Sequence, residues 1–285
     1  KYAEHPDLSA NHRIFFYIRE GFFDEYIDRM AIALRDLNHP VFLRFAHEMD
    51  NPMYPWSKTG HNSASEFKVA WTYIHDRFTE NGASNVTWVW NPWHPDAISE
   101  YFPYGNYGDT DQYVDYVGLT CLNYGKASID QRDKDFSTLY LPFKRKLVEL
   151  NIDLPVILAE FGTVSYTSNP DVWINRSLSE IKNNYPEIKA SVFFFSDLDK
   201  NWVTDWRPTP GSQFINWKFD ISKIVDSLQS FNVFNPVQFD KNKIVVSSSS
   251  YFKKEEDKYF WQIDSSEFYI KGIAYNPEHS WRDGN

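Results

Sequence analysis

The chain has little of what several classes of protein require. It carries a single cysteine, Cys121, which excludes an internal disulfide framework and a cysteine-rich metal site. It has no run of eighteen apolar residues, so no segment of the sequence is long enough to span a membrane. The net charge of -10 argues against a nucleic-acid partner, because a phosphate backbone repels an acidic protein. No apolar stretch follows Lys1, so no signal peptide is visible.

Cofactor motifs are also missing. No Gly-x-Gly-x-x-Gly follows any apolar run, so a nucleotide-binding open sheet has no support. The histidines, including His61, His75 and His94, lack the spacing of metal ligands. We therefore expect no metal site and no cofactor.

Aromatic residues are abundant instead. They make up 18% of the chain, with 11 Trp and 18 Tyr. Composition leaves two interpretations open. The aromatic side chains fill a heavy core, or some of them form platforms for sugar rings, whose C–H faces pack on aromatic faces.

Five short apolar runs, bounded by turn residues, predict buried strands. None alternates cleanly between apolar and polar residues, which is typical of parallel strands covered on both faces. The runs are 41–46, 86–90, 114–122, 155–159 and 191–195.

Helical patterns fill most of the gaps between these runs. Ser63 and Glu66 form a predicted capping box before a helix that stops at Asn81. Asn169 opens another helix. A further helix is expected at 24–38, with Met30 and Leu37 on its inward face. Another is expected at 139–150, with Pro142 in its first turn. The composition of the gap 91–113 predicts a loop.

The strand–helix alternation repeats roughly every 35 residues, which is the rhythm of a (β/α)8 barrel of the TIM type. In such barrels the carboxyl ends of the strands carry the active site. Glu48 and Glu160 each follow a buried run, three strand steps apart, so we expect them to meet at this rim. Either glutamate alone is more often a salt-bridge partner or a helix cap. As a pair amid aromatic residues they favour catalysis, because glycoside hydrolysis needs two carboxyl groups, about 5–5.5 Å apart in retaining enzymes.

Two motifs strengthen this hypothesis. "RFAHEMDNPMYPWS", around Glu48, and "ILAEFG", around Glu160, resemble the active-site motifs of glycoside hydrolase family 26. The similarity covers roughly residues 20 to 230 and implies a (β/α)8 barrel and a retaining mechanism, most often acting on β-mannan. Some members cleave mixed-linkage β-glucan or β-1,3-xylan.

The resemblance also assigns roles to single residues. It implies that Glu48 is the acid/base, whose pKa should be raised by burial and by its partner's charge, and that Glu160 is the nucleophile. By the same resemblance, His47 stands where related barrels often have Asn and would contact the sugar at the cleavage point, and Trp56 matches the family tryptophan that closes the loop. An aromatic-lined cleft is expected to include Trp56 with Trp90, Tyr124 or Trp206 as substrate-binding residues.

The sequence departs from the family pattern at two places. At the sixth strand the family usually shows Asp-x-Tyr, whereas this chain has Thr120-Cys121-Leu122. Tyr124, which shares the strand parity of Leu122, either supplies the missing hydroxyl from one step further out or is a rim aromatic. Met53 stands where the family commonly has Trp. Both departures affect the substrate more than the type of reaction.

By this resemblance the first strand here is the fourth of the barrel, so strands one to three are missing. We expect a fragment of a longer multidomain protein, with a partial barrel over 1–231 and a β-rich linker and start of a following domain over 232–285. The resemblance also implies an extracytoplasmic or secreted protein.

The expected partner is a polysaccharide or oligosaccharide, with β-1,4-mannan first. A glucanase or transglycosidase of the same family and a non-catalytic carbohydrate-binding fragment stay open as alternatives. A zinc protease with the His-Glu-x-x-His motif is excluded, because Asn51 occupies the place of the second histidine.

Overall fold

The computed structural model describes residues 12–104, 113–128, 130, 132–164, 169–196, 199–200, 214–224, 250–255, 258–263 and 266–268. The chain divides into two compact units, residues 1–224 and 225–285. The first unit contains the predicted glutamates. The division of the sequence at residue 231 into two domains stays a prediction.

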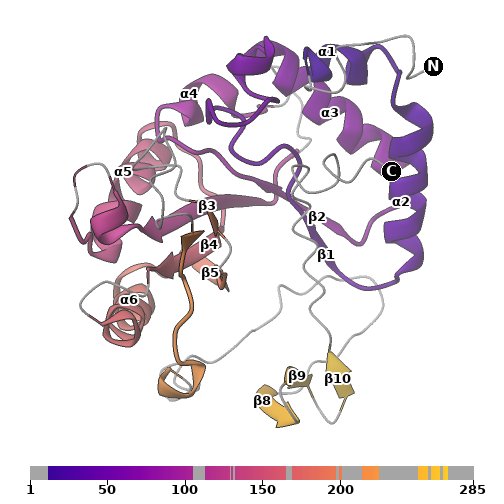
Figure 1. Ribbon diagram of the computed structural model, residues 1–285. Helices are drawn as coiled ribbons and strands as arrows, with labels where there is room; N and C mark the ends of the chain where they lie inside the picture. The colour runs from indigo at the N-terminus through magenta and orange to yellow at the C-terminus, as the bar shows by residue number, and fades with distance from the viewer. Residues whose placement is uncertain are drawn as a thin grey trace. The chain divides into compact units, whose positions relative to one another are not determined.

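The first unit is built on a five-stranded parallel sheet in the order β1-β2-β3-β4-β5 (Figure 1). The strands are β1 (Val41–Leu43), β2 (Val86–Trp90), β3 (Tyr116–Asn123), β4 (Val156–Thr163) and β5 (Ile188–Phe193). All five predicted strands are present, and the sheet curls as part of a (β/α) barrel, which confirms the predicted fold class. Among the described residues, β1 and β5 are edge strands, each paired on one side.

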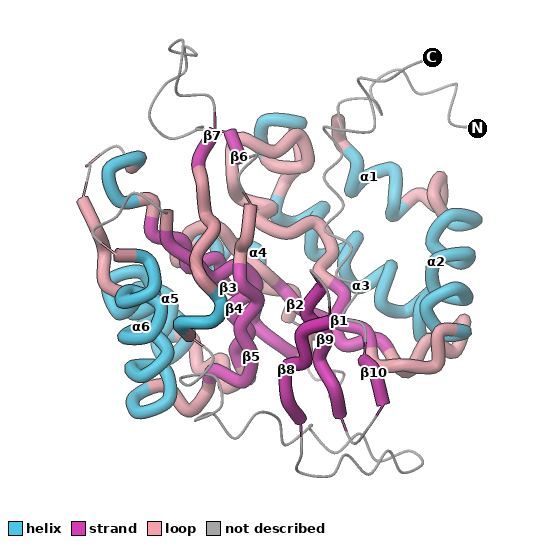
Figure 2. The backbone as a smooth tube through the Cα atoms, turned by 60° about the horizontal axis from the view of Figure 1, so that its bottom comes forward, coloured by secondary structure: helices cyan, strands magenta, loops and turns pink. Residues whose placement is uncertain are grey.

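Helices cross between the strands, as parallel pairing requires. They are α1 (Ile14–Arg19), α2 (Asp24–Asp36), α3 (Ala64–Glu80), α4 (Ala97–Tyr101), α5 (Phe136–Glu149) and α6 (Pro170–Asn184). The tube in Figure 2 shows α1, α2 and α3 gathered beside β1, while α5 and α6 lie beside β4 and β5 at the other side of the sheet. Helix α5 packs on β3 and α6 packs on β4.

Local signals set the ends of these helices. Ser63 and Glu66 form the predicted capping box of α3, with the Ser63 side chain accepting from the Glu66 N–H and the Glu66 carboxylate accepting from the Ser63 N–H. The Asn169 side chain accepts from the Val172 N–H and caps α6.

Several sequence-based expectations were wrong in detail. Strand β1 ends at Leu43 rather than at residue 46, because Ala46 has φ +44°, which no strand residue adopts. Helix α5 begins earlier than predicted, so Pro142 lies in its second turn. The expected loop 91–113 contains the short helix α4.

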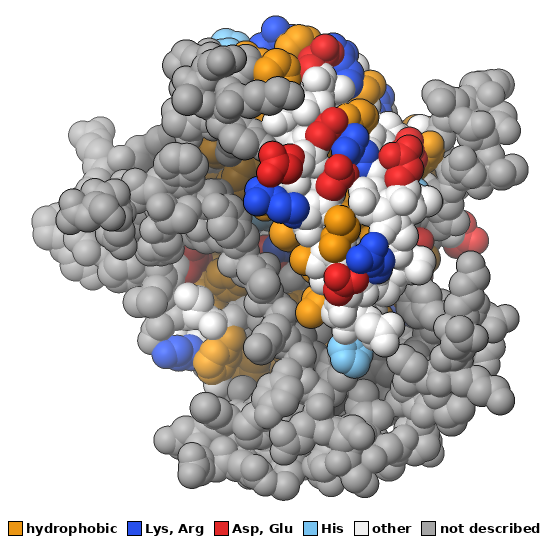
Figure 3. All heavy atoms as spheres, turned by 90° about the vertical axis from the view of Figure 1, so that its right-hand side faces the viewer, with side chains coloured by type: hydrophobic (Ala, Val, Ile, Leu, Met, Phe, Trp, Pro, Cys, Tyr) orange, Lys and Arg blue, Asp and Glu red, His pale blue; other side chains and the backbone are white. Residues whose placement is uncertain are grey.

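Helix α2 corrects another expectation. Its inward face is carried by Ile27 and Ala31, whereas Met30 and Leu37 are exposed. In Figure 3, which views the side on which α2 lies in Figure 1, acidic and basic side chains are interspersed with hydrophobic ones. The apolar side of this helix is therefore only partly covered by the described part of the chain.

Short two-residue and 3-10 elements complete the first unit. They are η3 (Lys58–Gly60), η4 (Gly125–Ala127), η5 (Ile221–Lys223), and the antiparallel pair β6 (Asp199–Lys200) and β7 (Phe214–Ile215). The second unit holds an antiparallel sheet in the order β10-β9-β8, made of β8 (Ser250–Glu255), β9 (Lys258–Ile263) and β10 (Ser266–Phe268). This confirms the predicted β-rich segment after the barrel.

The loop that follows Glu48 is tightly packed around Asn62. The Asn62 amide donates to the carbonyls of Pro55, Ser57 and Gly60, at 3.3, 3.3 and 3.2 Å. Its own oxygen accepts from the Phe15 N–H at 3.3 Å. A Cβ on Gly60 would lie 1.7 Å from the Pro55 carbonyl oxygen, so only glycine fits.

We predict that Gly60→Ala destabilises the protein by roughly 3 kcal/mol or more, because backbone atoms must move to admit the methyl group. The matched control is Gly82→Ala. Gly82 has φ +74° but an open environment, so its substitution should cost only the strain of the left-handed backbone, about 1–2 kcal/mol. Urea unfolding followed by tryptophan fluorescence compares the two. Equal losses would show that the Gly60 contact is easily relieved.

Candidate active site

Glu48 lies five residues beyond the end of β1, in a turn that leaves the sheet. Its backbone has φ +52°, a left-handed conformation that is uncommon for a residue with a side chain. The Glu48 N–H donates to the Asn91 carbonyl at 2.7 Å, which ties the turn to the end of β2. The side chain is only 5% exposed. A buried acid on a strained turn is a frequent feature of functional sites.

Each oxygen of the Glu48 carboxyl has a hydrogen-bond donor. Thr120 Oγ1 donates to Oε1 at 2.6 Å, and Asn51 Nδ2 donates to Oε2 at 2.8 Å. Burial and, after it, the negative charge of Glu160 nevertheless raise the pKa of Glu48 to about 7. The hydrogen bonds and the positive charge of Arg44 act in the opposite direction. The pKa is raised, as the sequence led us to expect.

Glu160 lies on β4 and forms an ion pair with Arg44. The Arg44 Nη2 is 2.8 Å from Glu160 Oε1, and its Nη1 donates to Asn91 Oδ1 at 2.9 Å. The pair is half-buried, so the guanidinium holds the carboxylate in one orientation. Arg44 therefore connects the turn of Glu48, the end of β2 and the middle of β4.

An irregularity in the sheet sets the direction of Glu160. The register shifts between Leu119 and Thr120, so that Leu119 pairs with Leu158 but Thr120 pairs with Glu160. Ala159 is the extra residue of this bulge. Bulges re-aim side chains beside active sites, and this one puts Glu160 level with the residue that donates to Glu48.

His47 and two tyrosines surround the carboxyl groups. Burial and, after it, the charge of Arg44 lower the pKa of His47 to about 3, so the imidazole is neutral at ordinary pH. Burial raises the pKa of Tyr54, and the charges of Glu48 and Glu160 add to the increase. Burial also raises the pKa of Tyr124, with added contributions from Asp199 and the two glutamates. The charges of the glutamates thus act on the same phenol groups.

The predicted aromatic residues differ in their surroundings. Trp56 is 9% exposed, stacks on Tyr54 with ring centroids 4.3 Å apart, and donates its indole N–H to the His47 carbonyl at 3.0 Å. Trp90 is completely buried against Phe102, so the structure corrects its expected position in a cleft: a central strand covered on both faces hides its side chain. Tyr124 is half-buried and meets Trp217 edge to face. Trp206 lies outside the described residues.

Sequence reasoning missed five polar or aromatic residues of this site: Arg44, Asn51, Tyr54, Asn91 and Thr120 as a hydrogen-bond donor. An arginine inside a predicted buried run was a usable signal, because arginine is almost never buried without a partner. The other residues are common in loops and strand ends, and nothing in the sequence alone distinguishes them.

An exposed tryptophan lies near the same turn. Trp93 is 46% exposed, two residues after Asn91, whose carbonyl accepts from Glu48. The Asp50 carboxylate accepts from the Trp93 N–H and the His94 N–H, each at 2.8 Å. The loop that carries this indole is therefore fixed to the segment that carries Glu48.

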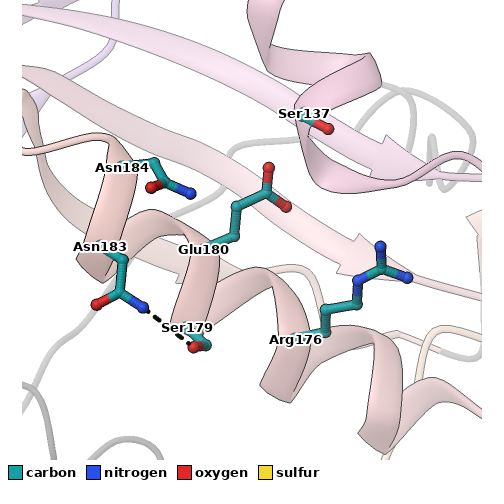
Figure 4. A pocket seen from close by; sticks show the side chains of 6 residues that line it. All are labelled: Ser137, Arg176, Ser179, Glu180, Asn183 and Asn184. Carbon is teal, nitrogen blue, oxygen red and sulfur yellow. Dashed lines mark hydrogen bonds between the residues drawn. The ribbon is translucent and has the colours of Figure 1, made fainter.

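A polar hollow of about 410 Å³ lies elsewhere, between α5 and α6 (Figure 4). Its lining residues are Ser137, Arg176, Ser179, Glu180, Asn183 and Asn184, and none of the candidate site residues contributes to it. Among the described residues, no group of three or more His, Cys, Asp or Glu side chains is placed to hold a metal ion. In that same part of the chain, no helix has the length and apolar character of a membrane span.

A model of glycosyl hydrolase family 26 matches residues 20–188. The chain is 30% identical over 194 residues to Endoglucanase H of Acetivibrio thermocellus, an alignment that covers 67% of this chain and 21% of that protein. It is 24% identical over 207 residues to a β-1,3-xylanase of an Alcaligenes species, covering 67% of this chain and 41% of the xylanase. The chain thus spans less than half the length of either relative.

Solved structures share the fold at lower identity. A GH26 β-mannanase from Bacteroides ovatus superposes with a TM-score of 0.50 at 19% identity, covering 73% of this chain and 56% of the mannanase. A modular endo-β-1,4-mannanase from Cellulomonas fimi gives a TM-score of 0.50 at 16% identity, covering 82% and 52% of the two chains. These similarities concern the architecture of the barrel.

We predict that Glu48→Gln stabilises the protein, and increasingly so as the pH rises from about 4.5 to about 7. The folded state holds the Glu48 proton up to a pKa of about 7, against 4.5 for the free side chain, so wild type loses stability over this range. The gain in unfolding free energy reaches at most about 3 kcal/mol above pH 7. The cost of placing a glutamine amide beside the Asn51 amide reduces this gain. Thermal unfolding at a series of pH values measures it. A difference that stays constant with pH would contradict the raised pKa.

Proposed function

The chain belongs to glycosyl hydrolase family 26, and from this membership and the paired glutamates we propose that it cleaves β-linked polysaccharide internally by a retaining, two-glutamate mechanism. The observation that carries the proposal is the contrast between the two carboxyl groups. One is buried and has a pKa of about 7, and the other is paired with an arginine. Acid and nucleophile need these two different environments.

In the proposed first step, a Glu160 oxygen attacks the anomeric carbon while the glycosidic C–O bond breaks. Glu48 gives its proton to the leaving oxygen, which becomes the hydroxyl of the released sugar chain. The products are a glycosyl ester on Glu160 and an anionic Glu48. Arg44 supports this step because it holds the attacking carboxylate in a fixed orientation.

In the proposed second step, Glu48 takes a proton from water while the water oxygen attacks the anomeric carbon. The ester bond breaks, the Glu160 carboxylate returns, and the configuration at the anomeric carbon is retained after two inversions. The distance between the two carboxyl groups is expected to be about 5–5.5 Å when substrate is bound. His47, being neutral, acts here as a hydrogen-bonding group toward the sugar rather than as a base.

Tyr54 and Tyr124 are proposed to border the sugar at the cleavage point, since both phenols respond to the charges of both glutamates. Trp93 is proposed as the stacking platform that the composition suggested. Its indole is exposed, whereas Trp56 and Trp90 are used in packing. The loop of Trp93 joins the segment of Glu48, so we place this platform on the side of the leaving group.

Two substrates are the main candidates. The sequence motifs put β-1,4-mannan first. The 30% identity to Endoglucanase H favours a β-glucan as the second. A panel of β-mannan, mixed-linkage β-glucan and β-1,3-xylan, with reducing ends counted over time, separates these candidates. A transglycosidase would use the same glutamates, so products must also be analysed at high sugar concentration. A non-catalytic binding protein would retain affinity without releasing reducing ends.

Removing the two glutamates should have different consequences in the full-length protein. Glu160→Ala removes the covalent step and should abolish most activity on every β-glycan. Glu48→Ala should be most damaging for substrates with poor leaving groups and should accumulate the glycosyl-enzyme, because water attack loses its base. Azide needs no base, so it should restore turnover to Glu48→Ala and give a β-azide of retained configuration, identified by NMR.

Two other outcomes would contradict the assignment of the two glutamates. Azide rescue of Glu160→Ala alone, with an inverted product, would confirm Glu160 and refute the role of Glu48. Unchanged polysaccharide cleavage by both variants would refute the paired-glutamate proposal as a whole.

The Trp93 platform gives a separate prediction. Trp93→Ala should raise KM for polysaccharide roughly fivefold to tenfold, because one ring-stacking contact is lost. It should leave small aryl glycosides unaffected, since these place no sugar on the leaving-group side. Tyr26→Ala, which removes an exposed aromatic side chain of α2, is the control and should change neither substrate. Equal losses on the two substrate types would mean that Trp93 acts through the stability of its loop.

A further inference from the structure

One of the two side chains that donate to Glu48 lies at a position where the family pattern has a different residue. Thr120 lies on β3, where Thr120-Cys121-Leu122 replaces the acidic pattern expected at this strand. It is the one residue of β3 that is not fully buried. Its strand partner is Glu160, and its hydroxyl contacts Glu48 at 2.6 Å. Thr120 thus pairs with Glu160 through the backbone and contacts the Glu48 carboxyl group through its side chain.

The two donors to Glu48 are not equivalent. The Asn51 oxygen accepts from the Met53 N–H at 3.0 Å, which orients the amide so that its nitrogen faces Glu48. Asn51 can therefore only donate. A threonine hydroxyl carries one proton and two lone pairs, and it rotates about a single bond. Thr120 can donate to the Glu48 carboxylate and can also accept from the neutral acid.

Glu48 must pass through both forms in the proposed reaction. It starts as an acid, becomes an anion when the leaving oxygen takes its proton, and regains a proton from water. The anion forms in a place that is almost completely shielded from solvent, where a lost hydrogen bond is costly. The donor to Oε1 therefore stabilises the anion that the first step produces and that the second step uses as its base.

We propose that Thr120 is a positioning residue that fixes Oε1 of Glu48 and stabilises its anionic form between the two steps of catalysis. This inference rests on the proposed function, because it requires Glu48 to be the acid/base. It adds a residue to which the sequence motifs gave no role. The bulge at Leu119 and Thr120 supplies the geometry, since it aligns Thr120 with Glu160 while leaving its hydroxyl directed to Glu48.

The test compares Thr120→Val with Thr120→Ser in the full-length protein. Valine keeps the shape but leaves Oε1 without a donor. The alkaline limb of the pH–rate profile, which reports the proton on Glu48, should move upward by about one pH unit. With activated aryl glycosides, kcat should fall roughly tenfold while KM also falls, because the glycosyl-enzyme accumulates. Serine retains the hydroxyl and should restore the wild-type limb and kcat.

Thr87→Val is the matched control on the neighbouring strand β2. Its hydroxyl is buried and makes no hydrogen bond, so its removal should leave the alkaline limb, kcat and KM each unchanged. A shift in this control as large as that of Thr120→Val would assign the effect to general loosening of the sheet and overturn the proposal.

Two further outcomes separate this inference from the proposed function. If azide rescues Glu48→Ala but Thr120→Val keeps the wild-type limb and kcat, the role of Thr120 is refuted and that of Glu48 stands. If Glu48→Ala retains full activity on substrates with poor leaving groups, the proposed role of Glu48 is refuted, and the role of Thr120 falls with it.

Discussion

The site depends on the burial of the Glu48 carboxyl group and, after it, on the charge of Glu160. A buried Glu48 beside Glu160 cannot be charged without cost, so it retains its proton to near neutrality. Arg44 breaks the symmetry of the pair because it contacts Glu160 directly and affects Glu48 only through its charge. Two identical side chains thereby lie in two different environments, one buried and the other paired with an arginine. The surrounding residues maintain that difference.

The scaffold maintains this difference by bringing together the carboxyl-terminal halves of the strands and the turns that follow them. Glu48 follows β1, Asn91 follows β2, Thr120 lies on β3 and Glu160 on β4. Parallel strands direct their carboxyl ends to the same side, and that end carries the functional residues in barrel enzymes. Gly118 permits the close approach: a Cβ there would lie 2.7 Å from Val89 Cγ1 on one neighbour and 3.4 Å from Ala159 on the other. The hydrogen bond between Glu48 and Asn91 then fixes the first turn to the second strand.

Much of this arrangement could be predicted from the sequence, and the reasons are local. Apolar runs without alternation predicted the five parallel strands, and Ser63 with Glu66 predicted the start of α3, because these signals act within a few residues. The direction of Glu160 could not be predicted, since it depends on a bulge that only the pairing of β3 with β4 creates. The predicted position of Trp90 was wrong because the sequence pattern of an aromatic residue at the end of a strand is the same whether its side chain points into the core or lies at the rim. Arg44 and Thr120 contact residues far away in the sequence, so their roles emerged only from the fold.

The central claim is that Glu48 holds its proton because of its burial and the charge of Glu160. Carbon-13 NMR of the glutamate carboxyl groups tests it directly in wild type and in Glu160→Gln. The account predicts that the Glu48 resonance titrates with a pKa of about 7 in wild type and with a lower pKa in the variant. A Glu48 resonance that titrates near 4.5 in wild type, or one whose pKa is unchanged by Glu160→Gln, would contradict the account.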